Sequence, residues 1–95
     1  MRDYELILVI APGVADGDVT PTVDKVTQWV VNLGGAITEV NPWGRRRLAY
    51  PIGKATEGLY VQAQLKLDAA HSSELDASLK ASGDILRYLL VRVGD

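Results

Sequence analysis

The chain has 95 residues, of which 47% are hydrophobic and 23% are charged, and its formal net charge is -2. This length and composition predict one small globular domain over residues 1–95. Because the chain has no cysteine, disulfides, thiolate metal sites and cysteine nucleophiles are excluded. No run approaches the roughly 18 apolar residues of a membrane span, and residues 6–11 are too short for a signal peptide. We therefore expect a soluble, cytoplasmic protein that makes no membrane contact.

The first predicted strand covers Tyr4 to Ile10. Both alternating sets of its side chains are largely apolar, which indicates a central position in a sheet whose second face is partly covered. Pro12-Gly13 ends this strand, and a polar loop follows over residues 14–19.

Thr20-Pro21 begins the first predicted helix, because threonine can cap free N–H groups and proline suits the first helical position. Gly34-Gly35 ends it in the usual C-terminal way. Apolar residues recur between these limits at steps of four and three and form a single stripe: Val19, Val23, Val26, Val30 and Leu33.

The second predicted strand runs from Ala36 to Tyr50, and its Pro42 and Gly44 predict a bulge and an edge position. A turn region over residues 51–58 separates it from a regularly alternating strand, residues 59–67. One set of side chains in this third strand is apolar and predicted to face the core: Leu59, Val61, Ala63, Leu65 and Leu67. The other set is predicted to face water or a partner: Tyr60, Gln62, Gln64 and Lys66.

Asp68 is predicted to cap a second helix over residues 69–82, with Leu75, Leu79 and Ala77 pointing inward. The last strand is expected over residues 85–93. The order is βαββαβ, and with a right-handed crossover it predicts an α+β, ferredoxin-like fold. Such a fold has one four-stranded antiparallel sheet with two helices on one face.

The segment from Trp43 to Lys54 is the most informative for function. It holds four of the ten basic residues, and no acid lies between Glu39 and Glu57. A local basic patch is typical of surfaces that bind phosphate-bearing partners, and Trp43 and Tyr50 could stack on bases. The alternative is a solvated basic hairpin without a partner.

The three consecutive arginines of this segment cannot all serve one surface of a regular strand. Arg45 and Arg47 are expected on one face, and Arg46 on the other with Leu48 and Tyr50. Our hypothesis is that two arginines bind phosphates and one packs on Tyr50 or on a partner protein, since guanidinium both binds phosphate and stacks.

Catalytic and metal-binding motifs are not visible. His71 is the only histidine and has no ligand-type neighbours, and Asp16 and Asp18 lack further oxygen ligands at loop spacing. We therefore expect no enzymatic activity, no cofactor, no metal and no small-molecule substrate.

Two functions of other classes are compatible with a fold that has this order of elements. An RNA-binding module of the aromatic-platform type would stack bases on aromatic residues such as Tyr4 and Tyr60, but the chain has no phenylalanine. An acyl phosphate hydrolase would need an arginine in the loop after the first strand, and residues 12–18 contain none.

The run from Arg46 to Ile52, followed by Lys54, closely resembles the hallmark segment of bacterial small-subunit ribosomal protein six. Three further segments match in order along the whole chain: Met1-Arg2 with Tyr4-Glu5, Gly58 with Tyr60, and Asp84-Ile85-Leu86-Arg87. The resemblance implies a ferredoxin-like structural protein of the small (30S) ribosomal subunit in the cytoplasm. It also implies binding, together with ribosomal protein eighteen, to the central domain of small-subunit (16S) ribosomal RNA during assembly.

The resemblance places the RNA-binding residues in or near the hairpin, and we add two arginines from the other matching segments. The expected set is Arg45, Arg46, Arg47, Tyr50, Lys54, Arg2 and Arg87. Because the two helices cover only one face of the sheet, the other face is left for a protein partner. The expected partner-binding set on that face is Val9, Tyr60, Gln62 and Gln64.

Overall fold

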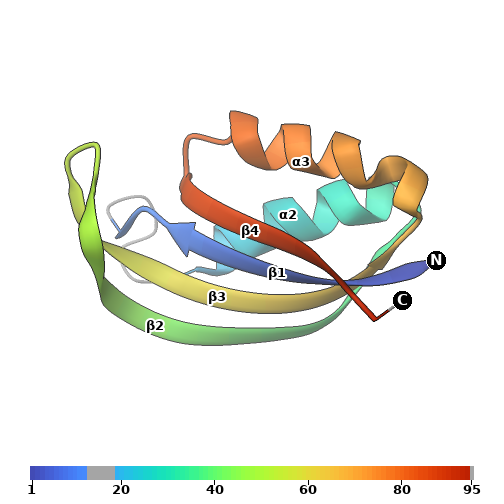
Figure 1. The fold of residues 1–95 in the computed structure, drawn as a ribbon, viewed down its shortest axis with the longest axis horizontal. Coiled ribbons are helices and arrows are strands. Elements are labelled where there is room, and N and C mark those ends of the chain that lie inside the picture. Colours follow the sequence, from blue (N-terminus) through green and yellow to red (C-terminus); the bar gives the residue numbers. More distant parts are fainter. Residues whose placement is uncertain (13–18, 95) are drawn as a thin grey trace.

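The computed structural model describes residues 1–12 and 19–94. Its elements are β1 (Arg2–Ile10), α2 (Thr20–Asn32), β2 (Ala36–Ile52), β3 (Ala55–Leu67), the 3-10 helix η1 (Ala69–His71), α3 (Ser72–Ala81) and β4 (Ile85–Val93). These strands form one antiparallel four-stranded sheet in the order β2-β3-β1-β4. Figure 1 shows α2 and α3 together on one side of it. The ferredoxin-like fold, the central β1 and the edge position of β2 are confirmed.

Two sequence predictions fall on the segment after β1. The predicted glycine stop at Gly13 and most of the polar loop lie outside the described residues, as do Asp16 and Asp18. No helix in the described part of the chain is long and apolar enough to cross a membrane.

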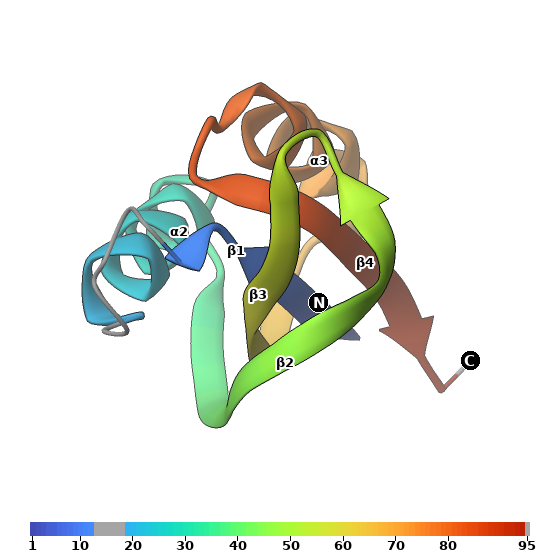
Figure 2. The same cartoon turned by 90° about the vertical axis from the view of Figure 1, so that its left-hand side faces the viewer.

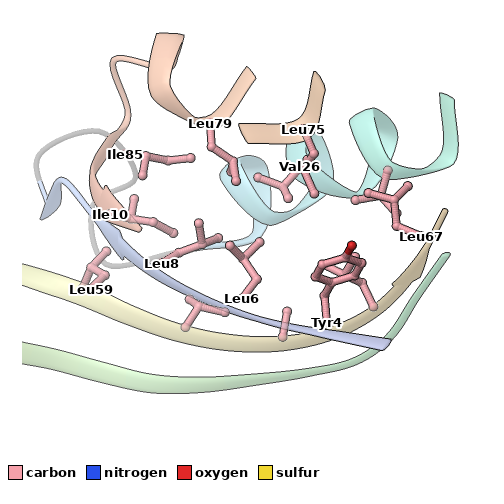
Figure 3. Close-up of a cluster of buried hydrophobic side chains, with 14 residues drawn as sticks. Tyr4, Leu6, Leu8, Ile10, Val26, Leu59, Leu67, Leu75, Leu79 and Ile85 are labelled. Atoms are coloured by element: carbon pink, nitrogen blue, oxygen red, sulfur yellow. The ribbon is translucent and has the colours of Figure 1, made fainter. Parts of the chain in front are cut away.

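The hydrophobic core lies between the sheet and the two α-helices. Leu6, Leu8 and Ile10 of β1 point toward Leu75 and Leu79 of α3, as Figure 3 shows. All five predicted core residues of β3 are buried, and Val26 and Val30 are buried on α2. Each fully buried side chain of this size contributes about 1.5–3 kcal/mol through removal of apolar surface from water. The alternation in β1 and β3 therefore predicts the core face correctly.

The predicted helix start at Thr20-Pro21 and the predicted cap at Asp68 are confirmed, but the predicted capping role of Thr20 and the α-helical form of residues 69–71 are wrong. Val19, rather than Thr20, occupies the N-cap position of α2, and it makes no side-chain capping bond. Its backbone carbonyl accepts a hydrogen bond from Val23 N at 3.0 Å, so Thr20 is already helical. The Asp68 carboxylate caps the short helix η1 by accepting from Ala70 N at 3.0 Å, and α3 begins only at Ser72.

The buried face of α3 agrees with the prediction at two of its three residues. Leu75 and Leu79 are fully buried, but Ala77 is exposed, so its predicted inward position is wrong. Residues four apart on a helix share a face, whereas a residue two positions away lies nearly opposite. On α2, Gly34 adopts φ +84 after the last turn, as the predicted glycine stop requires.

The turn between β2 and β3 is shorter than the predicted turn region over residues 51–58, and the two strands of the hairpin are correspondingly longer. Strand pairing continues to Ile52 opposite Ala55, which leaves only Gly53 and Lys54 in the turn. Gly53 adopts φ +60, a conformation that a two-residue hairpin turn uses. Pro51 is tolerated in β2 because an edge strand need not donate a hydrogen bond on its outer side. The hairpin consequently extends past the end of the sheet (Figure 1).

The predicted bulge in β2 is confirmed, and it decides which way the arginines face. The register shifts between Pro42 and Gly44, so Pro42 pairs with Val61 but Arg45 pairs with Leu59. Gly44 has φ +88, as a bulge of this kind often requires. A shift of one residue moves following side chains to the opposite face.

Candidate nucleic-acid and protein interface

Arg45 and Arg47 lie on the same face of the hairpin, as the sequence predicts. Arg45 pairs with Leu59 and Arg47 with Glu57, and those two partners share the helix side of β3. Arg45 Nη1 forms an ion pair with Glu57 Oε2 at 3.3 Å. The sequence contains no acid between Glu39 and Glu57, but Glu57 itself neutralises one arginine from the neighbouring strand. Only knowledge of the cross-strand register reveals this pairing.

Two cations of the hairpin remain available. Arg47 and Lys54 are exposed, and neither forms an ion pair within the described residues. Lys54 lies in the two-residue turn at the tip of the hairpin. Tyr50 is 63% exposed, so it is not a core residue. The projecting hairpin thus presents free positive charge and an aromatic ring to solvent.

Arg46 lies on the opposite face of the hairpin from its two neighbours. It pairs with Gly58, and its guanidinium carbon lies 5.9 Å from the centre of the Trp43 ring. This is the distance range of a cation–π interaction. The prediction that Arg46 faces away from Arg45 and Arg47 is therefore confirmed, whereas phosphate binding by the other two stays a prediction. The aromatic ring near Arg46 is that of Trp43 rather than Tyr50.

A groove lies on the sheet face that the helices leave open. Two adjoining hollows of about 90 Å³ and 260 Å³ share Val9, Tyr60 and Arg87 as lining residues. We call this feature the Arg87 groove. Its remaining lining comes from the hairpin on one side and from β1 and β4 on the other: Leu48, Ala49, Tyr50, Ile52, Ile7, Tyr88 and Leu89. In Figure 2 the hairpin stands upright with β4 passing behind it.

Gly58 permits the close packing beside this groove. A Cβ atom at this position would collide with the Val9 side chain and would lie 3.5 Å from Leu48 Cδ2. The absence of a side chain therefore lets the β2 arm of the hairpin approach β1 across β3. In the sequence Gly58 stands out only as part of a family motif, and its physical role depends on the pairing of the strands.

The middle of the open face carries a row of hydrogen bonds across three strands. Asn41 Nδ2 of β2 donates to Gln62 Oε1 of β3 at 2.8 Å, and Gln62 Nε2 donates to Glu5 Oε2 of β1 at 3.2 Å. Gln62 is only 6% exposed, so its amide is committed within the chain. Of the expected partner-binding residues, Gln64 is exposed, Tyr60 is half-buried and Val9 is largely buried.

The structure separates the remaining two residues of the expected RNA-binding set from the hairpin arginines. Arg2 pairs with Leu67, at the end of the sheet opposite the hairpin turn. Arg87 pairs with Val9 and lies in the Arg87 groove, on the face opposite Arg45 and Arg47. The set therefore occupies three places rather than one surface.

His71 has a local structural role at the start of α3. Its Nδ1 lies 2.9 Å from Glu74 Oε1, and this hydrogen bond raises the pKa of His71 above its usual value of 6.5, with a smaller opposing effect of desolvation. Within residues 1–12 and 19–94 no group of three or more His, Cys, Asp or Glu side chains could hold a metal ion.

Comparisons with known proteins agree with this fold. The family model described as "Ribosomal protein S6" matches residues 3–92. Small ribosomal subunit protein bS6 of Desulforamulus reducens is 41% identical over 95 residues, covering 100% of both chains. The bS6 protein of Moorella thermoacetica is 41% identical over 93 residues, covering 98% of this chain and 95% of the relative.

A solved structure extends the same agreement to three dimensions. The crystal structure of 30S ribosomal protein S6 from Thermotoga maritima superposes with a TM-score of 0.86 at 29% identity, covering 96% of this chain and 86% of that one. This chain belongs to the bacterial ribosomal protein S6 family and is a structural protein of the small subunit of the cytoplasmic ribosome.

Proposed function

We propose that this protein binds the central domain of 16S ribosomal RNA through its projecting hairpin and binds ribosomal protein eighteen through its open sheet face. The observation that carries the RNA part is the pair of free, exposed cations Arg47 and Lys54 on a hairpin that extends past the sheet. Guanidinium and ammonium groups in such positions neutralise phosphates and release counterions. The family implies a structural role of this kind rather than a catalytic one.

The distribution of charge decides which of the two surfaces, the hairpin or the open face, we propose for RNA. The open face carries Asp3, Glu5 and Glu39, because these residues pair with Lys66 or Gln64 of β3 and share their side. Lys66 Nζ is already engaged by Asp3 Oδ1 at 3.0 Å. At this end of the face the three carboxylates outnumber Lys66, so it repels a phosphate backbone, whereas a protein can match it. We therefore restrict the proposed RNA surface to Arg45, Arg47 and Lys54, because Tyr50 lines the Arg87 groove.

The aromatic-platform alternative loses support from the position of Tyr4. That mode needs stacking aromatics on the open faces of β1 and β3. Tyr4 is instead buried in the core under the helices, and Val9 pairs with Tyr60 on the open face. A single half-buried tyrosine is left on the two central strands, so base stacking there is not proposed.

The test is a titration of the 16S central-domain RNA with the protein, with and without ribosomal protein eighteen, at two salt concentrations. The Arg47→Ala/Lys54→Ala variant should bind RNA more weakly and lower the slope of log affinity against log salt by about one per lost phosphate contact. Lys80→Ala is the matched control, because Lys80 is exposed on α3 at the covered side of the sheet.

The titration has three informative outcomes. Loss of affinity and of salt slope in the hairpin variant, with the control unchanged, supports the RNA surface. Unchanged affinity and slope in the hairpin variant would overturn it. Failure of the unsubstituted protein to bind RNA even with ribosomal protein eighteen would overturn the proposed function as a whole.

A further inference from the structure

A hollow of about 200 Å³ lies between the two α-helices. Its lining comes from the end of α2 and from α3: Trp29, Asn32, Leu33, Glu74 and Ser78. We call it the helix groove. Figure 1 shows both helices on one side of the sheet, so this groove is separate from the open face, and none of its lining residues belongs to the hairpin.

The helix groove combines an apolar wall with several acceptors of hydrogen bonds. Trp29 and Leu33 pack against the hydrophobic core but are only half-buried, so part of each side chain reaches the surface. Asn32, Glu74 and Ser78 each carry an oxygen atom that can accept a hydrogen bond. An aromatic wall beside a set of acceptors suits a flat cation, because its plane can lie on the ring while its edge donates.

Glu74 gives the helix groove its negative charge. His71 Nδ1 lies 2.9 Å from Glu74 Oε1 and so holds the carboxylate from one side. A carboxylate has a second oxygen, here Oε2, with acceptor sites of its own. The Glu74 side chain is 58% exposed, so a ligand can reach it. The carboxylate is therefore oriented by the protein and still able to accept hydrogen bonds from a partner.

No lysine or arginine lines the helix groove. The two lysines of the helix layer are engaged elsewhere, because Lys25 Nζ lies 2.8 Å from Asp84 Oδ2 and Lys80 Nζ lies 3.9 Å from Asp76 Oδ2. The carboxylates of residues 20–34 and 68–84 outnumber these lysines: Asp24, Asp68, Glu74, Asp76 and Asp84. A surface with this excess of negative charge attracts a basic partner and repels RNA.

We propose that the helix groove binds an arginine side chain of a basic polypeptide. The guanidinium plane lies on the Trp29 ring, and its N–H groups donate to Glu74 Oε2 and to the Ser78 hydroxyl. The surrounding carboxylates favour a segment with several basic residues over free arginine. This binding is independent of the proposed function, because neither the hairpin nor the open face takes part in it.

Arginine fits the helix groove better than lysine or a nucleotide does. Its guanidinium is planar and weakly hydrated, so it can stack on an aromatic ring and donate hydrogen bonds at the same time. The lysine ammonium is a compact, strongly hydrated charge that has no flat face to place on Trp29. A nucleotide base can stack on the same ring, but Glu74 would repel its phosphate.

The experiment is a fluorescence titration of the full-length protein with a blocked tetra-arginine peptide, and with a blocked tetra-lysine peptide for comparison. Trp43→Phe is the background, because it removes the only other tryptophan and leaves Trp29 as the sole reporter. The emission of Trp29 should change to saturation with tetra-arginine. Tetra-lysine should bind about threefold more weakly, because it lacks the stacking contribution.

Two charge-neutralising variants locate the site in this background. Glu74→Gln should weaken tetra-arginine binding about fivefold, because the amide keeps the shape of the side chain but removes its charge. Asp24→Asn is the matched control, since it makes the same charge change at an exposed position of α2 that does not line the groove. It should bind within about twofold of the background, and circular dichroism checks that each variant folds.

A third variant tests the aromatic wall directly. Trp29→Leu keeps an apolar side chain at this position but removes the ring, so it should weaken tetra-arginine binding about threefold. Because this variant lacks the reporter, its binding is measured by calorimetry against the unsubstituted protein. Binding that is weaker in both Glu74→Gln and Trp29→Leu supports the site.

Three results would overturn the site. Emission of Trp29 that does not respond to tetra-arginine would show that no guanidinium reaches the ring. Equal affinities of Glu74→Gln and Asp24→Asn would show that overall charge alone attracts the peptide. Equal binding of tetra-arginine and tetra-lysine would remove the stacking on Trp29. None of these results bears on the proposed function, because the titration contains neither RNA nor ribosomal protein eighteen.

Discussion

The two faces of the sheet are built from the same strands, but one face is covered by helices and the other is open. On the covered face, Leu6 and Leu65 are fully buried beneath α2 and α3. On the open face, Leu89, Val91 and Val93 of β4 are 55%, 42% and 51% exposed. The covered face therefore supplies the stability of the monomer, whereas the open face keeps apolar surface that only association can bury.

The polar groups of the open face are organised rather than merely solvated. The hydrogen bonds from Asn41 to Gln62 and from Gln62 to Glu5 cross β2, β3 and β1. They fix the central side chains of the face before a partner arrives, and preorganisation of this kind reduces the entropy lost on binding. The two faces thus differ in organisation: one is a packed core, and the other is an exposed surface with ordered polar side chains, which we propose binds a partner.

Leucine truncation on the two faces gives the largest expected contrast. Leu6→Ala should lower the free energy of unfolding by about 2–5 kcal/mol, because it removes a fully buried side chain and leaves a cavity. Leu89→Ala should change it by less than about 0.5 kcal/mol, since that side chain is largely exposed. Urea unfolding followed by circular dichroism measures both; losses of similar size would show that the open face also stabilises the monomer.

The hydrogen-bonded row predicts a smaller contrast within the open face itself. Gln62→Ala should cost about 1–3 kcal/mol, because it leaves the Asn41 amide and the Glu5 carboxylate without their shared partner. Gln64→Ala is the matched control on the same strand and face, and its exposed side chain should contribute less than about 0.5 kcal/mol. Equal unfolding free energies for the two variants would contradict a structural role for the row.

The smallest expected effect lies at the start of α3, away from both faces. The folded pKa of His71 is raised above 6.5, chiefly by its hydrogen bond with Glu74, so the protonated form is favoured in the folded state. This contribution to stability is fully present below pH 6.5 and is lost as the pH rises through the raised folded value. Glu74→Gln should flatten that part of the pH dependence of the unfolding free energy. A slope that persists unchanged in Glu74→Gln would assign it to another group.

Sequence patterns predicted the features that depend on local order. The alternation in residues 59–67, the helical spacing of Val26 and Val30 and the disruption at Pro42-Gly44 gave the core face, the first helix and the bulge. Each of these signals depends on neighbours within a few positions, which the sequence displays directly.

Features that depend on register or on the sheet order were not predictable in the same way. The Glu57 ion pair with Arg45 and the burial of Gln62 arise only when β2 and β3 pair in one specific register. The approach of Arg87 to the hairpin requires β4 to lie beside β1, two strands from β2. The turn at Gly53-Lys54 lies inside the predicted turn region, but that region is too wide, because the strands continue to Ile52 and from Ala55 and an edge strand accommodates Pro51.

The central claim is that the hairpin and the open face are separate surfaces, and one pair of titrations on Arg47→Ala/Lys54→Ala tests it most directly. The variant should bind ribosomal protein eighteen with unchanged affinity, while its complex should bind the 16S central-domain RNA more weakly and with a smaller salt slope. Loss of partner affinity in this variant, or RNA binding that matches the unsubstituted protein in affinity and slope, would contradict the claim.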